Sequence, residues 1–241
     1  MMKKFLLLIG YVTWLFVPLC AQQPQEDIEQ LYRQGRFADA LLAYEQELKN
    51  YPNDPFLYYN IGNAYFKMGS TGLAVANYYR AYKLLPRDRD IRHNLSLALA
   101  SCGEQLAPAD IPAAVYNAFF YLSYAELKGL TFALFWLTAF VGFIWLARRK
   151  GFKVFAVVGI CLLVCATWLY ARYQWENKPL AVVASPSAEI RSGPGTNFPA
   201  NATAAQGHLL TILDKKDRWY EVILDSQSIK GWVESNAIEK I

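Results

Sequence analysis

The residue types capable of covalent catalysis are few in this chain and far apart. The sequence contains four cysteines and two histidines among 241 residues. A cysteine nucleophile needs an imidazole close enough to take its proton, but His93 and Cys102 fall on one predicted helix and at its end, and His208 falls in a region without cysteine. The HExxH, Gly-x-Ser-x-Gly and phosphate-loop patterns are also absent. We therefore expect no enzymatic activity, no cofactor and no metal.

Cys161 and Cys165 lie one helical turn apart within a long apolar stretch. They could be a redox or metal pair, or small packing residues. Metal sites usually combine cysteine with histidine or carboxylate ligands, and this stretch contains none of these. We favour the packing interpretation.

The N-terminus has the order of a secretory signal peptide. Lys3 and Lys4 precede an uncharged run over 5–19, and a polar stretch follows Ala21. The run is short for a bilayer crossing, so we predict a cleaved signal peptide over 1–21. Lipoprotein processing at Cys20 is the alternative, but the leucine before it is unfavourable because that processing usually requires a small residue.

Two further uncharged stretches, 129–147 and 154–171, are each long enough to cross a bilayer as a helix. The loop between them, 148–153, contains Arg148, Arg149, Lys150 and Lys153. Short positively charged loops stay on the cytoplasmic side. We therefore predict a transmembrane hairpin integral to the bacterial inner (cytoplasmic) membrane, with both soluble regions facing the periplasm.

The formal net charge of +4 does not indicate a nucleic-acid partner. Six cations flank the N-terminal run or lie in the 148–153 loop, where they serve membrane topology. The remaining residues therefore have a small negative net charge, so no basic surface for nucleic acid is predicted.

The region 22–103 contains an internal repeat with a period of about 34 residues. The matching residues are Leu31, Gly35, Phe37, Ala40, Tyr44 and Pro52 in the first copy, and Tyr58, Ile61, Gly62, Tyr65, Gly69, Ala74, Tyr78, Ala81 and Pro86 in the second. This pattern resembles the tetratricopeptide repeat, which implies stacked helical hairpins with small residues where paired helices approach. We predict an all-α repeat solenoid.

A third copy starts at Asp90, with Ile91, Leu95 and Leu99 on one stripe, and breaks at Gly103. We interpret it as a capping helix. Two and a half repeats are fewer than the three that usually bury a stable core, so the domain should depend on the membrane-proximal segment or on a partner.

The resemblance implies a binding surface formed by the first helix of each pair. By their positions in the motif, its residues are Tyr32, Phe56, Tyr59, Asn63, Phe66, Lys67 and His93. Asn63 matches an asparagine that binds peptide backbone in some family members, whereas Tyr59 replaces the expected carboxylate-binding lysine. A charged C-terminal tail is therefore disfavoured as ligand. Each aromatic could instead pack against the next repeat.

A connector over 104–128 joins the repeat to the first predicted span. Its part 113–122 is apolar and aromatic but too short to cross a bilayer. It could lie along the membrane surface, where aromatic residues are favoured, or be an ordinary buried helix. Ser123 and Glu126 have the spacing of a capping box, so a new helix should begin there.

The region 179–241 has alternating and short apolar runs separated by turn formers, which predicts a small all-β domain. The runs are 181–184, 209–213, 220–224 and 231–233. Three segments, 190–197, 217–222 and 231–233, resemble bacterial SH3-like domains, which implies a small barrel. Related domains bind cell-wall peptides or proteins. The candidate ligand contacts are Arg191, Asn197, Phe198, Trp219 and Trp232, although the 231–233 segment could instead complete the core.

The whole order of signal peptide, repeats, two spans and SH3-like domain resembles that of the Bat (Bacteroides aerotolerance) proteins. The resemblance implies a membrane complex with other Bat proteins, some with von Willebrand A domains, linked to aerotolerance or stress survival. Two functions follow as hypotheses. One is a scaffold that binds a protein partner in the membrane through the repeats, and the other is a sensor or tether that binds peptidoglycan through the β-domain.

Overall fold

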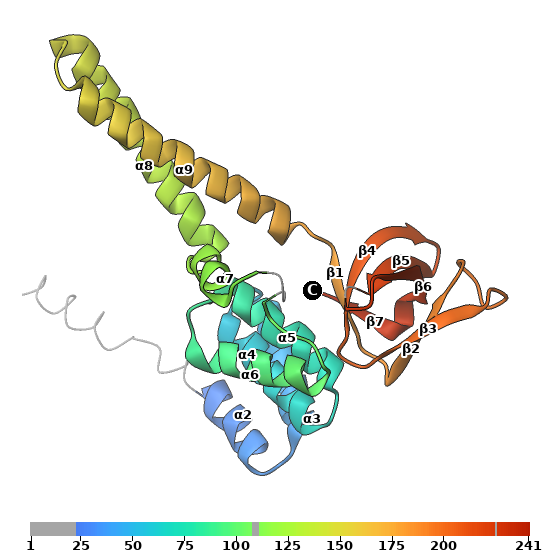
Figure 1. Ribbon diagram of the computed structural model, residues 1–241. Helices are drawn as coiled ribbons and strands as arrows, with labels where there is room; N and C mark the ends of the chain where they lie inside the picture. The colour runs from blue at the N-terminus through green and yellow to red at the C-terminus, as the bar shows by residue number, and fades with distance from the viewer. Residues whose placement is uncertain (1–22, 108–110, 225) are drawn as a thin grey trace, which may run out of the picture.

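The computed structural model describes residues 23–107, 111–224 and 226–241. The predicted signal peptide over 1–21 and the lipoprotein alternative at Cys20 lie outside the described residues. Figure 1 shows a cluster of helices, a long helical hairpin that extends away from it, and a β-domain beside the cluster.

The helices of the first soluble region follow one another as antiparallel pairs. They are α2 (Gln23–Arg33), α3 (Phe37–Asn50), α4 (Pro55–Lys67), α5 (Thr71–Leu84) and α6 (Arg89–Ser101). Gly35, Gly69 and Gly103 follow α2, α4 and α6, and all three have φ between +75° and +77°. Glycine adopts this left-handed conformation without steric cost. The 34-residue period therefore corresponds to three equivalent turns.

Small residues allow α4 and α5 to pack closely, as the sequence predicted. A Cβ added at Gly62 would lie 2.6 Å from Cδ1 of Tyr78, and Ala74 and Ala81 are fully buried. Because interiors are close-packed, a larger side chain at Gly62 would force the two helices apart.

The connector contains a short helix, α7 (Ala113–Phe119). Tyr116 and Phe120 are buried against the repeat, whereas Val115 and Tyr121 are exposed. Of the two alternatives for the connector, the buried-helix one therefore applies to Tyr116 and Phe120, which belong to the protein core.

The hairpin consists of α8 (Tyr124–Arg148) and α9 (Phe152–Glu176). These helices contain both predicted spans and continue beyond them, and their most apolar windows have mean hydropathy 2.0 and 2.4. Phe132, Phe143 and Leu163 are each at least 66% exposed. Water does not favour so large an apolar surface, so the hairpin is compatible with a membrane anchor. The predicted capping box between Ser123 and Glu126 is present.

The β-domain is one antiparallel sheet with order β3-β2-β6-β5-β4-β1-β7. Its elements are β1 (Leu180–Val183), β2 (Ser187–Arg191), β3 (Ala200–Ala205), β4 (Leu209–Lys216), β5 (Trp219–Leu224), β6 (Ile229–Glu234), a 3-10 turn (Ser235–Ala237) and β7 (Ile238–Lys240). The predicted barrel is not closed, because β3 and β7 remain edge strands of the sheet.

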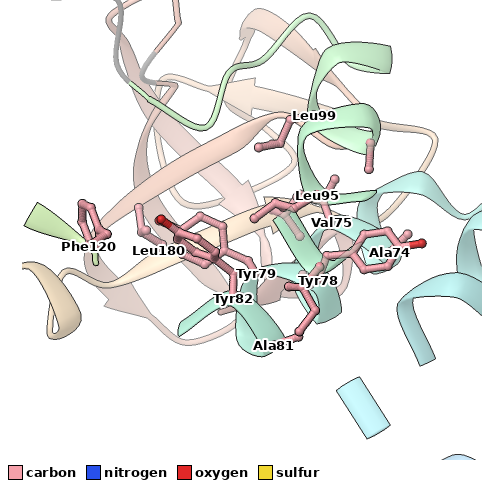
Figure 2. Close-up of a cluster of buried hydrophobic side chains, with 14 of the residues drawn as sticks. Ala74, Val75, Tyr78, Tyr79, Ala81, Tyr82, Leu95, Leu99, Phe120 and Leu180 are labelled. Carbon is pink, nitrogen blue, oxygen red and sulfur yellow. The ribbon is translucent and has the colours of Figure 1, made fainter. Parts of the chain in front are cut away.

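Strand β1 contributes to two cores because all four of its residues are buried. Leu180 and Val182 pack into the repeat core, and Ala181 and Val183 pack into the β-domain core. Alternate residues of a strand point to opposite faces, so one short strand joins both domains. Figure 2 shows Leu180 beside Tyr79 and Tyr82 of α5.

The contact between the two domains is close elsewhere too. A Cβ at Gly72 of α5 would overlap the carbonyl oxygen of Val183. Arg80 of α5 forms a 2.5 Å ion pair with Glu239 of β7 and also donates to the backbone carbonyl of Lys240. The repeat and the β-domain are therefore docked against each other.

Candidate functional site

The helices α4 and α6, each the first helix of its repeat, share a network of polar side chains with Tyr78 of α5. Tyr78 Oη donates to Asn63 Oδ1 over 2.7 Å, and Asn94 Nδ2 lies 2.9 Å from the same oxygen. Asn94 Nδ2 also lies 3.0 Å from the hydroxyl oxygen of Tyr59. These contacts fix the orientation of both amides, since the shared Asn63 oxygen accepts from both neighbours.

The two amides of the network keep one donor group and one acceptor group that could bind a ligand. Within the described part of the chain, Asn63 Nδ2 and Asn94 Oδ1 have no hydrogen-bond partner, and neither residue is fully buried. A peptide unit offers one carbonyl acceptor and one N–H donor. The two amides can therefore recognise the backbone of an extended segment.

Burial strengthens the hold of Tyr78 on the proton that it donates in this network. Burial, and to a smaller extent the neighbouring Tyr59, raises the pKa of Tyr78. Because an ionised phenol could not donate, the raised pKa keeps the Tyr78 hydroxyl able to donate to Asn63 further into the alkaline range than an exposed tyrosine would be.

The other predicted residues of this face divide into two groups. Phe56, Lys67 and His93 are exposed and available for a partner. Tyr32 is half-buried with its ring edge-on to Phe37, at a centroid distance of 5.1 Å, and Phe66 packs against the repeat core. The packing alternative therefore applies to Tyr32 and Phe66. We name the group Phe56, Tyr59, Asn63, Lys67, His93 and Asn94 the repeat face.

The β-domain has a groove of about 350 Å³. Among its lining residues are Ser187, Glu189, Arg191, Trp219 and Glu234. It combines an indole with both signs of charge, which suits a ligand that carries sugar or peptide groups.

Two of the predicted contacts in this domain have structural duties. Arg191 donates to the backbone oxygens of Thr196 and Phe198 and pairs with Glu189, so its guanidinium holds the adjoining loop. Phe198 covers Gly193, where an added Cβ would lie 2.6 Å from its ring.

The two remaining predicted contacts, Asn197 and Trp232, are not among the residues that line the groove. Asn197 Oδ1 lies over Gly195, where an added Cβ would be 2.5 Å away. Trp232 is half-buried on the face of β6 opposite to Gly231 and Val233, and it does not line the groove. The core alternative holds for Gly231 and Val233 but not for Trp232. Trp219 is therefore the strongest of the predicted contacts.

Arg172 organises the junction between the hairpin and the repeat, and the sequence did not indicate this. Its side chain is 1% exposed and donates to the carbonyls of Phe119 and Leu122 and, over 2.7 Å, to Glu176. It also lies 4.6 Å from the ring centre of Phe120. The Arg172/Glu176 spacing of four residues, directly after the second span, was the available signal.

The thiol of Cys102 has the character of an unactivated cysteine. Burial raises the pKa of the Cys102 thiol, the opposite of the change that activates a nucleophile. Among the described residues, no group of three or more His, Cys, Asp or Glu side chains could hold a metal ion.

Comparison with known proteins identifies both soluble modules. Residues 29–69 match the TPR repeat family model, and residues 186–239 match the bacterial SH3 domain model. The first match covers α3, α4 and the second half of α2, and the second covers the sheet from β2 into β7. No curated protein matches the chain.

Proposed function

We propose that this chain is a non-enzymatic membrane-anchored adaptor whose repeat face binds an extended segment of a membrane protein. The single observation that carries the proposal is the fixed pair of amides, Asn63 and Asn94, each with one group that has no hydrogen-bond partner among the described residues. The TPR match supports it, because such repeats serve protein–protein interaction.

The chemistry of the repeat face describes its partner. Asn63 and Asn94 would bind backbone groups, Phe56 offers an exposed ring, and Lys67 offers one positive charge. An extended segment with an apolar residue and a carboxylate would match these groups.

The partner and setting follow from the order of the modules. That order resembles the BatE-like members of the Bat proteins, and on this basis the partners would be Bat proteins of the same membrane, including those with von Willebrand A domains. The role would then be in aerotolerance or stress survival. The Arg148 to Lys153 loop supports an inner-membrane hairpin with both soluble domains in the periplasm.

The test is co-purification of the full chain from its native membrane in mild detergent. Asn63→Asp keeps the oxygen that accepts from Tyr78 and Asn94 but replaces the donor with a charged acceptor. Asn50→Asp makes the same change at an exposed residue at the end of α3. We expect about a 5- to 150-fold loss of one co-purifying membrane protein in Asn63→Asp alone, since unsatisfied partners cost roughly 1–3 kcal/mol.

The outcomes separate binding from folding. Thermal unfolding of both variants near the wild-type temperature would show that the repeat is intact. Equal recovery of the partner with Asn63→Asp and Asn50→Asp would contradict the proposal.

A second function is favoured by the β-domain groove. Trp219 and the polar groups around it could bind cell-wall peptides or glycan, which the bacterial SH3 match supports. The chain would then be a cell-wall sensor or tether. Sedimentation of the full chain with purified peptidoglycan should be lost in Trp219→Ala and retained in Trp232→Ala. Removal of the whole β-domain would be a poor test, because it also uncovers the repeat core.

A further inference from the structure

A second groove lies where the repeat meets the base of the hairpin, and its volume is about 620 Å³. One wall comes from the repeat, including Tyr58, Arg80 and Lys83. The other wall comes from the first turns of α8, including Tyr124 and Lys128, with Glu176 of α9. The repeat face and the β-domain groove use other residues.

Positive charge exceeds negative charge around this groove. Glu176 accepts from Arg172 over 2.7 Å and also lies 3.8 Å from Lys83. Arg80 is paired with Glu239. The residues that line the groove therefore include three cations, Arg80, Lys83 and Lys128, and one carboxylate, Glu176. Counted with the partners Arg172 and Glu239, the excess is still about two positive charges, which favours an anion.

The position of the groove relative to the apolar surface suggests where this anion comes from. Lys128 is exposed and lies 4.8 Å from the ring centre of Tyr124. The exposed apolar side chains of α8 begin within the next turn, at Leu130 and Phe132. Tyrosine and lysine side chains occupy the level of the lipid headgroups at the ends of membrane helices. The groove therefore opens at headgroup depth.

We propose that this groove binds the phosphate of an anionic phospholipid from the leaflet next to the soluble domains. Lys83 and Lys128 contact the headgroup, and the acyl chains lie along the exposed apolar face of α8. The bound lipid fills the space between repeat and hairpin and fixes the soluble domains against the membrane surface. This inference shares with the proposed function only the insertion of α8 and α9, and lipid binding and partner capture can fail separately.

The test is a titration of the delipidated full chain in detergent, followed by native mass spectrometry. The probes are phosphatidylglycerol, zwitterionic phosphatidylethanolamine and soluble glycerol phosphate. The variants are Lys128→Gln and Lys83→Gln with Lys128→Gln, and the control is Lys150→Gln at the opposite end of the hairpin. Lys128 and Lys150 are both exposed, so their substitution should not disturb folding.

We expect phosphatidylglycerol to bind more tightly than phosphatidylethanolamine, and each lysine lost to weaken it on the order of fivefold, since one such charge contributes about 1 kcal/mol. Lys150→Gln should bind as wild type does. Equal affinity for both lipids, or unchanged affinity in Lys128→Gln, overturns the proposal. Displacement of the lipid by equimolar glycerol phosphate assigns the groove to a soluble phosphate ester and also overturns it.

Discussion

The repeat and the β-domain complete their cores in different ways. The β-domain core is made of its own strands, including Ile190, Leu210 and Val222. The repeat core instead includes Leu180 and Val182 of β1, and Tyr116 and Phe120 from the connector. Two and a half repeats bury too little surface to be stable alone, so the repeat depends on segments from elsewhere in the chain. The comparison teaches that the two soluble domains form one unit rather than two independent modules.

The largest expected effect comes from shortening the strand that both domains share. Leu180→Ala removes a side chain that is 7% exposed and belongs to the repeat core. It should destabilise the repeat by about 2–4 kcal/mol. The measurement is hydrogen exchange of the α5 and α6 amides. We expect these amides to exchange faster, even though the substituted residue lies in the β-domain. Leu213→Ala, at an exposed position of β4, is the control. Unchanged exchange in α5 would show that the repeat does not need β1.

A somewhat smaller effect is expected from Gly72→Ala, which pushes a methyl group against the Val183 carbonyl. Overpacking of this kind costs about 1–3 kcal/mol. Thermal unfolding of the full chain should therefore occur at a lower temperature. Gly129→Ala, which meets no atom within 4 Å, should not lower it. Equal behaviour of the two variants would mean that the domains separate without cost.

The free energy of unfolding of the repeat should depend on pH in the alkaline range through Tyr79 of α5. Burial raises the pKa of Tyr79 from 10.0 to about 12. Below pH 10 this tyrosine is neutral in both folded and unfolded chains, so its contribution is fully present there. Between about pH 10 and 12 the unfolded chain ionises first, and stability falls as the pH rises.

Tyr79→Phe should therefore reduce the alkaline loss of stability. Urea unfolding followed at α5 amides, at neutral pH and above pH 10, measures the change. A Tyr79→Phe variant with the same alkaline loss as wild type would contradict the assignment of this effect to Tyr79.

The smallest expected effect is at the partly exposed ion pair between the domains. Arg80→Gln removes the ion pair with Glu239. The side chain of Arg80 is 27% exposed and that of Glu239 is 40% exposed. The cost should be below about 1 kcal/mol, because such pairs are screened by solvent. As the salt concentration increases, the thermal unfolding temperature of the wild type should approach that of Arg80→Gln, because salt screens the ion pair. A loss of stability as large as that of Leu180→Ala would contradict this, because it would mean that the ion pair, rather than the packing of β1, holds the domains together.

The sequence predicted the elements whose signals are local. The 34-residue period and its glycines predicted α2 to α6, and the apolar runs predicted β1, β4, β5 and β6. The strands β2, β3 and β7 were not predicted as such. β3 consists mainly of small, largely exposed residues, and β7 has three residues, so neither carries a clear alternation signal.

The missed site residues depend on distant parts of the chain. Asn94 joins Tyr59 and Asn63 only because α6 packs beside α4. Arg172 binds backbone carbonyls about 50 positions earlier, and sequence spacing does not reveal such partners. For β1, the run LAVV is uniformly apolar rather than alternating. That pattern is typical of a strand buried on both faces, and it was a usable signal for the docking of the two domains.

The most direct test of the adaptor function is photo-crosslinking in native membranes. A benzophenone amino acid at Phe56, on the repeat face, is compared with one at Leu42, which is similarly exposed on the second helix α3. We predict an adduct with one membrane protein from position 56 only, and its loss when Asn63→Asp is added. Adducts of equal yield from both positions, or an adduct that survives Asn63→Asp, would contradict the assignment of partner binding to the repeat face.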